Sequence, residues 1–298
     1  MNDSRMGSEG RREGRQQDVL PNKAVARPQR VMNRLLGRPF GVPRPDHYTV
    51  YHCCIQKSAS RWFLRFFRDR ELQGYTGLAV YEPKENFVPG GPDLRALGEI
   101  PTGFFVTPLY VRYGDFAARV PKPPEYRAFY VMRDPRDIVV SDYFSLRYSH
   151  PTTHEYICTM REKLSRMSKE DGLAERIENA RGSYFSVLAE WGAAEADELV
   201  RLFRYEDLFG PDQEIAIADL LVHCRLRIPR RVLRRLLAKH SFERLAGRPQ
   251  GQEEVRQHYR KGVAGDWRNH FTEGHKRLFK SKAGELLVAL GYEKDLSW

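Results

Sequence analysis

The chain has 298 residues with 41% hydrophobic and 12% aromatic content, so it can close one large core but has little room for a second full domain. Its formal net charge is +11, and residues 1–45 carry 10 Lys and Arg against 4 Asp and Glu, a net of +6. No apolar run in this segment is long enough for a signal-peptide core or a membrane span. We therefore predict a disordered basic tail at 1–45, one folded domain at 46–298 and a cytoplasmic location.

Two further features of the chain fit this location. The tail has carboxylates at Asp3, Glu9, Glu13 and Asp18, where transit peptides usually avoid them. The four cysteines have neither zinc-site nor redox-motif spacing, so we expect reduced thiols at Cys53, Cys54, Cys158 and Cys224. The charge of the tail is expected to be solvated, and no nucleic-acid partner is predicted from it.

The first predicted unit after the tail is a strand, a loop and a helix. His47–Ile55 is rich in β-branched and aromatic residues, Gln56–Ser60 is polar, and Arg61–Arg70 has aromatic residues at helical spacing. That spacing gives the helix one apolar face, which we expect to pack on a sheet.

Strands and helices are predicted to alternate along the rest of the chain. Short apolar runs predict strands at Gly77–Tyr81, Gly103–Thr107, Arg127–Met132 and Leu199–Tyr205. Helices are predicted at Asp137–Arg147, Glu155–Arg166, Leu173–Trp191, Asp212–His223, Arg230–Lys239 and Lys276–Leu290. This alternation indicates an α/β fold with a P-loop-like parallel sheet flanked by helices, in a single domain with a helical insertion.

The loop Gln56–Arg61 is the first candidate binding site, because ligands of open α/β sheets bind at the carboxyl ends of strands. Small residues let backbone N–H groups approach an anion, the helix start adds a favourable dipole, and Lys57 brings a positive charge. An ordinary helix N-terminus would explain the same residues equally well. The G-x-x-x-x-G-K-[ST] pattern of nucleoside triphosphatases is absent, since no Gly precedes Lys57.

Two later segments can also bind anions. In Tyr130–Ser141, a helix that starts at Pro135 brings Ser141 round about two turns, so Arg133 and Ser141 can face one phosphate. In Tyr259–Phe271, a pair of cations precedes two glycines, whose backbone freedom allows close approach to an anion. Taken alone, Tyr130–Ser141 could equally be a capped helix with a solvated Arg. Tyr259–Phe271 taken alone could be an exposed basic loop.

Together, the three segments resemble those of the sulfotransferases that use 3'-phosphoadenosine 5'-phosphosulfate (PAPS), over residues 47–292. In that family they are close to Y-P-K-S-G-T-T-W, R-x-P-x-D-x-x-x-S and R-K-G-x-x-G-D-W-K-N-H-F, and this chain follows the second and third closely. The implied activity is transfer of a sulfuryl group from PAPS to an acceptor hydroxyl or amine, with release of adenosine 3',5'-bisphosphate (PAP).

The resemblance also implies roles for individual residues. The first loop would cradle the 5'-phosphosulfate through Lys57, Ser58, Ala59, Ser60 and Arg61, with Trp62 near the adenine. The 3'-phosphate would be held by Arg133, Ser141, Arg260, Lys261 and Gly262. The implied nucleotide pocket is completed by Tyr205, which begins the family tetrapeptide Tyr205-Glu206-Asp207-Leu208, and by Phe242, for which a core position is nearly as well supported.

This sequence departs from the family pattern at two places. The first loop has Ala59, Ser60 and Arg61 where the family commonly has Gly and two threonines. Cytosolic members place a catalytic histidine in a K-T-H motif after the third strand, and here that region reads Val106-Thr107-Pro108-Leu109.

Sulfuryl transfer needs a base for the acceptor, in-line attack at sulfur, and stabilisation of the charge that grows on the bridging oxygen. Lys57 is placed for the last task. Glu82 is the preferred base, because it follows the strand Gly77–Tyr81 and because carbohydrate sulfotransferases use a glutamate after the second strand; a solvated Glu82 is about equally well supported. His52, Glu85 and His270 are weaker candidates.

PAPS is the expected co-substrate, and no metal is expected, because neither H-x-x-x-H nor clustered-carboxylate spacing occurs. The expected partner is a small-molecule, lipid or carbohydrate acceptor, which the segment 149–194 would border by its position in the family. Two other classes stay open: a phosphate-loop small-molecule kinase, which would need magnesium, and a basic nucleic-acid-binding protein.

Overall fold

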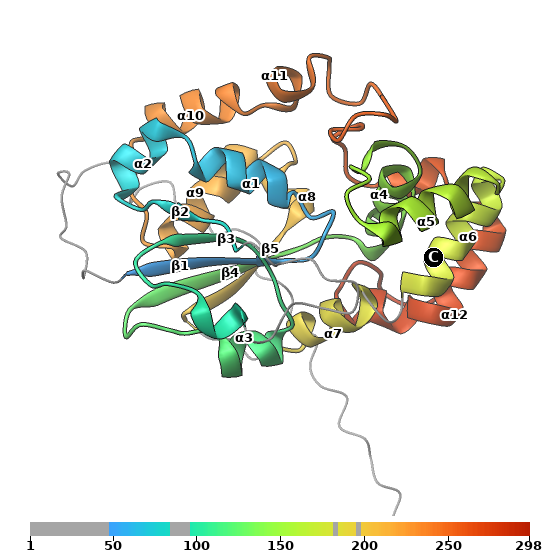
Figure 1. Cartoon of the computed structure of the whole chain (residues 1–298), viewed down its shortest axis with the longest axis horizontal. Coiled ribbons are helices and arrows are strands. Elements are labelled where there is room, and N and C mark those ends of the chain that lie inside the picture. The colour runs from blue at the N-terminus through green and yellow to red at the C-terminus, as the bar shows by residue number, and fades with distance from the viewer. Residues whose placement is uncertain (1–47, 84–95, 181–183, 195–197) are drawn as a thin grey trace, which may run out of the picture.

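A five-stranded parallel sheet forms the centre of the computed structural model, which describes residues 48–83, 96–180, 184–194 and 198–298 (Figure 1). The strand order is β2-β3-β1-β4-β5. The strands are β1 (Thr49–Cys54), β2 (Val80–Tyr81), β3 (Phe105–Tyr110), β4 (Tyr126–Met132) and β5 (Val200–Arg204). The predicted tail, its boundary with the domain, and Glu85 lie outside the described residues.

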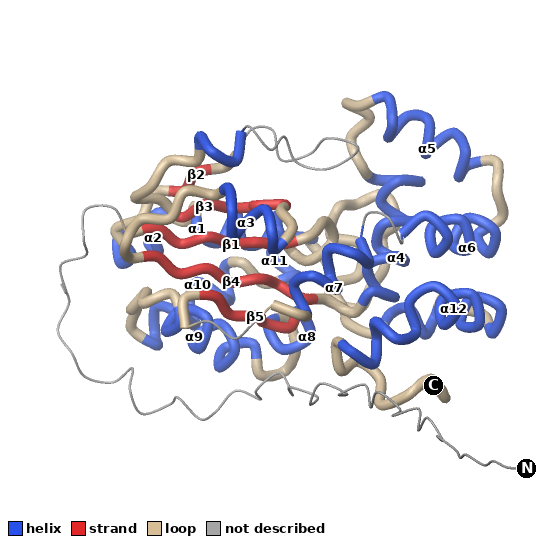
Figure 2. Tube along the Cα trace, turned by 90° about the horizontal axis from the view of Figure 1, so that it is seen from below, coloured by secondary structure: helices blue, strands red, loops and turns tan. Residues whose placement is uncertain are grey.

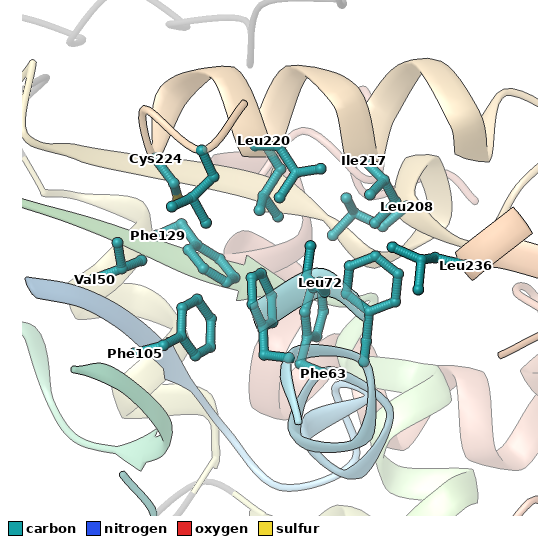
Figure 3. Close-up of a cluster of buried hydrophobic side chains, with 14 of the residues drawn as sticks. Val50, Phe63, Leu72, Phe105, Phe129, Leu208, Ile217, Leu220, Cys224 and Leu236 are labelled. Atoms are coloured by element: carbon teal, nitrogen blue, oxygen red, sulfur yellow. The ribbon is translucent and has the colours of Figure 1, made fainter. Parts of the chain in front are cut away.

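Helices cover both faces of the sheet (Figure 1). One face is covered by α1 (Ser60–Phe67), α2 (Arg70–Thr76), α8 (Tyr205–Leu208), α9 (Gln213–His223) and α10 (Arg230–Lys239). The other is covered by the 3-10 turn Ala96–Glu99, α3 (Tyr113–Arg119) and α7 (Ser186–Gly192). Figure 3 shows the first of these cores, where Phe63 from α1 meets Phe105 and Phe129 from the sheet and Leu220 from α9.

A third group of helices lies beyond one end of the sheet (Figure 2). It consists of α4 (Pro135–Phe144), a π-helical turn (Ser145–Ser149), α5 (Glu155–Ser165), α6 (Lys169–Ala180) and α12 (Glu273–Ala289), which share a separate buried cluster. Because β4 leads directly into α4, the carboxyl end of β4 is joined to this helical group. The remaining short elements are α11 (Phe242–Ala246) and the 3-10 turn Asp266–Asn269.

The predicted α/β fold with a parallel sheet is confirmed, and each predicted strand matches a strand of the sheet. The helix predicted at Leu173–Trp191 falls on two described helices, α6 and α7, and residues 181–183 between them lie outside the described residues. Its first part belongs to α6, which packs on α4 and α12, whereas its last part is α7, which packs on α3. The two parts therefore serve different cores. None of the described helices is both long and apolar enough to cross a membrane.

The third strand runs past the predicted end at Thr107. It continues through Pro108 to Tyr110, and its pairing with β1 shifts between Tyr51 and Cys53. A proline inside a sheet is tolerated at such an irregularity, because it has no N–H to donate to the ladder. The region in which cytosolic sulfotransferases carry a histidine is therefore buried strand in this chain.

One buried cation fixes the start of α4. The Arg136 side chain is 1% exposed, bonds to Asp134 and Glu293, and lies over the rings of Trp267 and Trp298 at 3.9 and 4.5 Å. Removing it would leave two buried or half-buried carboxylates without their partner, which is more costly than the loss of an exposed pair.

We expect Arg136→Leu to lower the free energy of unfolding by about 3 kcal/mol in urea titrations. Arg166→Leu is the matched control, because Arg166 pairs with Glu162 while both side chains are exposed. A loss no larger than that of the control would contradict the importance of the Arg136 contacts.

Candidate functional site

The loop between β1 and α1 has an unusual backbone. Lys57 and Ala59 both have left-handed conformations, with φ of 69° and 66°, which side chains other than glycine rarely adopt. Ser58 Oγ donates to the Ile55 carbonyl at 2.6 Å, and Ser60 Oγ lies 2.8 Å from the Tyr110 hydroxyl. Position 59 therefore has a backbone conformation that suits Gly, although the residue is Ala. Backbone strain of this kind is commonly found at functional sites.

Lys57 connects this loop to the helical group. Its Nζ donates to Ser145 Oγ at 2.5 Å, and its carbonyl accepts a hydrogen bond from Arg133 Nη1 at 2.6 Å. Burial lowers the pKa of Lys57, and the nearby Asp142 carboxylate opposes this change. The first two predicted anion-binding segments are therefore in direct contact.

Arg133 lies at the centre of the site. It is buried at the end of β4, and its guanidinium lies 4.2 Å from the centre of the Tyr205 ring. Within the described part of the chain, its buried Nε–H has no hydrogen-bond partner. A buried donor that lacks a partner is costly, so this group is suited to receive an anion. Ser141 lies half-buried on α4.

Asp137 joins the second segment to the third. Its two carboxylate oxygens accept from the backbone N–H groups of Gly265, at 2.6 Å, and Trp267, at 2.9 Å. One of these oxygens is 4.0 Å from Arg133 Nη2. Burial raises the pKa of Asp137, and the Arg133 charge opposes the rise.

The third segment is organised around Asp266. Its carboxylate accepts from Arg260 and Lys261, both at 2.6 Å, and also bonds to Asn269 and His270. Although burial favours the neutral form, these hydrogen bonds hold the pKa of Asp266 well below its ordinary range. The two cations are consequently fixed in place.

Gly262 and Phe242 are in contact. Gly262 has φ of 72°, and a Cβ at this position would lie 2.2 Å from the Phe242 ring. Phe242 is half-buried, outside the buried core. Trp62, by contrast, is buried in the core next to the sheet, and its Nε1 donates to the His240 carbonyl at 2.8 Å, two residues before Phe242.

The structure places the candidate bases in different surroundings. Glu82 follows β2 as predicted, and its carboxylate accepts from Arg68 at 2.6 Å in a half-exposed ion pair. His52 is fully buried between Phe63 and Phe129, and burial lowers its pKa to about 3. It faces the core and cannot reach an acceptor. His270 is bound to Asp266.

Among the described residues, one group of possible metal ligands comes together: Glu253, Asp266 and His270. Arg260 bonds to both of the carboxylates in this group. Arg260 therefore supplies the positive charge that balances Glu253 and Asp266.

Three residues near Lys57 were not predicted from the sequence. Ser145 accepts the Lys57 hydrogen bond, and His150 and His258 are within electrostatic reach of its ammonium group. A serine and two histidines outside a recognised motif give no signal in the sequence. The π-helical turn that carries Ser145 is a feature often found at functional sites, but only the backbone reveals it.

Glu206, from the predicted tetrapeptide, contacts the start of α4 beside Arg133. One of its oxygens accepts from the Asp134 N–H at 2.9 Å, and the other is 3.2 Å from the Tyr292 hydroxyl. Burial raises the pKa of Glu206 to about 7. The side chain therefore changes its charge near neutral pH.

Fold and site together define an α/β protein that gathers cations and backbone N–H groups at the carboxyl end of a parallel sheet. The family model described as "Sulfotransferase domain" matches residues 121–290, more than half of the chain. The chain belongs to the sulfotransferase family.

Solved structures with the same fold are distant in sequence. A mouse sulfotransferase, SULT7A1, complexed with PAP is 19% identical with a TM-score of 0.57, over 82% of this chain and 88% of that chain. Retinol dehydratase in a complex with retinol and PAP is 18% identical with a TM-score of 0.53, over 80% and 81% of the two chains. A search of curated proteins gave no match.

The raised pKa of Glu206 predicts a specific dependence of stability on pH. The folded state keeps this proton up to about pH 7, whereas the unfolded chain loses it near the ordinary value of 4.5. The contribution of Glu206 to stability is therefore complete below the ordinary pKa and is lost as the pH rises through about 7.

Gln resembles the protonated acid, so Glu206→Gln should gain stability relative to the wild type as the pH rises. Unfolding midpoints measured in urea across this range test the expectation, with the exposed Glu162→Gln as control; a constant difference between Glu206→Gln and wild type would contradict it.

Proposed function

We propose that this protein transfers a sulfuryl group from PAPS to the hydroxyl or amine of an acceptor and releases PAP. The observation that carries the proposal is the position of Arg133. It contacts the first loop through the Lys57 carbonyl, the Tyr205 ring, and, through Asp137, the backbone of the third segment. Three segments that are far apart in sequence therefore converge on one place, as a nucleotide with phosphate groups at both its 3' and its 5' end would require.

Each end of the nucleotide has a suitable group of residues. The buried Arg133 and the fixed cations Arg260 and Lys261 can receive the 3'-phosphate, together with Ser141 and Gly262. The loop Lys57, Ser58, Ala59, Ser60 and Arg61 can receive the 5'-phosphosulfate. Tyr205, Phe242 and Trp62 are the proposed neighbours of the adenosine. In support, the solved structures of SULT7A1 and retinol dehydratase are both complexes with PAP.

Lys57 is the proposed catalytic cation. As the sulfuryl group leaves, negative charge grows on the oxygen that bridges it to the nucleotide phosphate, and an ammonium group in a site shielded from water stabilises this charge strongly. Because burial lowers the pKa of Lys57, its proton is also more easily donated to that oxygen. Glu82 stands as the sequence-based proposal for the base.

The wider setting of the reaction is also proposed. The acceptor is a small molecule, lipid or carbohydrate, and the catalytic domain spans 46–298. We propose a cytoplasmic location, supported by the four cysteines, all of which are free thiols. No metal is required in this proposal, since cationic side chains carry the charge.

A thermal-shift panel separates the proposed function from its alternatives. PAP should raise the melting temperature, whereas ATP with magnesium and a single-stranded oligonucleotide should have little effect. Gly262→Ala should abolish the PAP shift, because the added Cβ would collide with Phe242. Stabilisation by ATP with magnesium would favour a kinase, and a steeply salt-dependent shift with the oligonucleotide would favour nucleic-acid binding.

Lys57→Ala should lower the rate of PAP formation from PAPS about 10²-fold or more, which is a larger loss than any weakening of PAP binding. The rate is measured with an acceptor panel of phenols, sterols and sugars, chosen on the wild type. Lys163→Ala is the control, since Lys163 is a half-exposed lysine on α5. Wild-type turnover in Lys57→Ala would rule out the proposed role.

A further inference from the structure

An arginine outside the three predicted segments lies beside the last of them. Arg248 is the second residue after α11, and its guanidinium makes five hydrogen bonds, one from Nε and two from each Nη nitrogen. A guanidinium has five N–H donors, so its capacity is fully used. All of the acceptors are uncharged oxygens, and they belong to Ala246, Gln252, Gln257, Tyr259 and Arg260.

The segment Arg248–Glu254 binds every backbone carbonyl of Tyr259–Gly262. Arg248 Nη2 donates to the first two of these carbonyls, and its bond to the second is 2.6 Å long. The other donors are Gln250 Nε2 at 2.5 Å and the backbone N–H groups of Gly251 and Glu254, both at 2.9 Å. Four successive carbonyls are therefore held by one short segment.

The direction of these carbonyls matters for an anion site. A carbonyl oxygen carries partial negative charge, so it has to point away from a phosphate, whereas N–H groups and cations face it. In Tyr259–Gly262 the four carbonyls face Arg248–Glu254, while the cationic ends of Arg260 and Lys261 meet at Asp266. The backbone is thus oriented as binding of a 3'-phosphate by this segment requires.

Arg248 also contacts a proposed neighbour of the adenosine. Its guanidinium carbon lies 5.3 Å from the centre of the Phe242 ring. The same ring touches Gly262, where a Cβ would lie 2.2 Å away. One side chain therefore supports both Phe242 and the segment that carries Arg260 and Lys261.

We propose, on the basis of the proposed function, that Arg248 is a positioning residue for the 3'-phosphate of the nucleotide. It acts through the backbone of Tyr259–Gly262 and needs no contact with the nucleotide itself. Preference for a nucleotide with a 3'-phosphate over one without it then depends on Arg248. Lysine cannot replace it, because an ammonium group has three donors and no planar fork.

The first experiment uses the protein without any nucleotide. In Arg248→Lys, the amides of Gly251 and Glu254 should exchange with solvent about tenfold faster or more, because the carbonyls that they bind are no longer held. The amides of Gly265 and Trp267 should stay protected, since Asp137 binds them. Hydrogen exchange followed by NMR measures all four.

Arg256→Lys is the matched control. Arg256 is an exposed arginine of the same loop, and within the described part of the chain its side chain makes neither a hydrogen bond nor an ion pair. Exchange at Gly251 and Glu254 should equal that of the wild type in this variant. If Arg248→Lys also leaves these two amides unchanged, Arg248 does not hold the segment and the proposal is overturned.

The second experiment compares PAP with adenosine 5'-monophosphate, which lacks the 3'-phosphate. Calorimetry should show a Kd for PAP about tenfold higher in Arg248→Lys than in wild type, and a Kd for the monophosphate within about twofold. Arg248→Gln should behave in the same way, and it serves as the test if Arg248→Lys unfolds at low urea. An unchanged Kd for PAP overturns the proposal, as does an equal loss for both nucleotides, which a purely structural role would give.

The two experiments also separate this proposal from the one on which it rests. A wild type that does not bind PAP would refute the proposed function. The exchange rates of Gly251 and Glu254 would still show whether Arg248 holds the backbone of Tyr259–Gly262.

Discussion

The buried carboxylate of Asp137 is the contact on which the site depends. Its two oxygens hold the backbone of Gly265 and Trp267 against the start of α4, so a loop near the end of the chain is fixed beside Arg133. The parallel sheet brings together only the residues that follow its strands, such as Lys57 after β1 and Arg133 after β4. This carboxylate adds a segment that belongs to no strand, and the proposed phosphate site is incomplete without it.

The cations of the site are held in two different ways. Arg260 and Lys261 are neutralised by Asp266 and Glu253 together, so they are positioned at little electrostatic cost. Arg133 has only a distant contact with Asp137, and its Nε–H has no partner among the described residues. The first pair provides geometry, whereas Arg133 provides an open hydrogen-bond donor. A phosphate would gain most from the latter, because a buried donor that lacks a partner is costly.

The sequence predicted the sheet, because apolar strands alternate with helices, and its motifs singled out three segments that the structure brings together around Arg133. It did not predict α2, α3, α8 or α11, which are too short to show helical periodicity and are held by packing. It also placed the end of the third strand too early, since Pro108 usually ends a strand and here lies within one. Ser145 and His150 were missed because their relation to Lys57 depends on a turn with i to i+5 bonding, which no residue pattern encodes.

That turn also bears on how the surroundings of Lys57 could change during evolution. A π turn accommodates one residue more than an α turn of the same span, so an insertion or deletion of a single residue here would convert one into the other. The helices on either side could keep their packing while a different side chain came to face the lysine. Relatives could thus exchange the side chain beside Lys57 by a change of length, without altering the proposed nucleotide site.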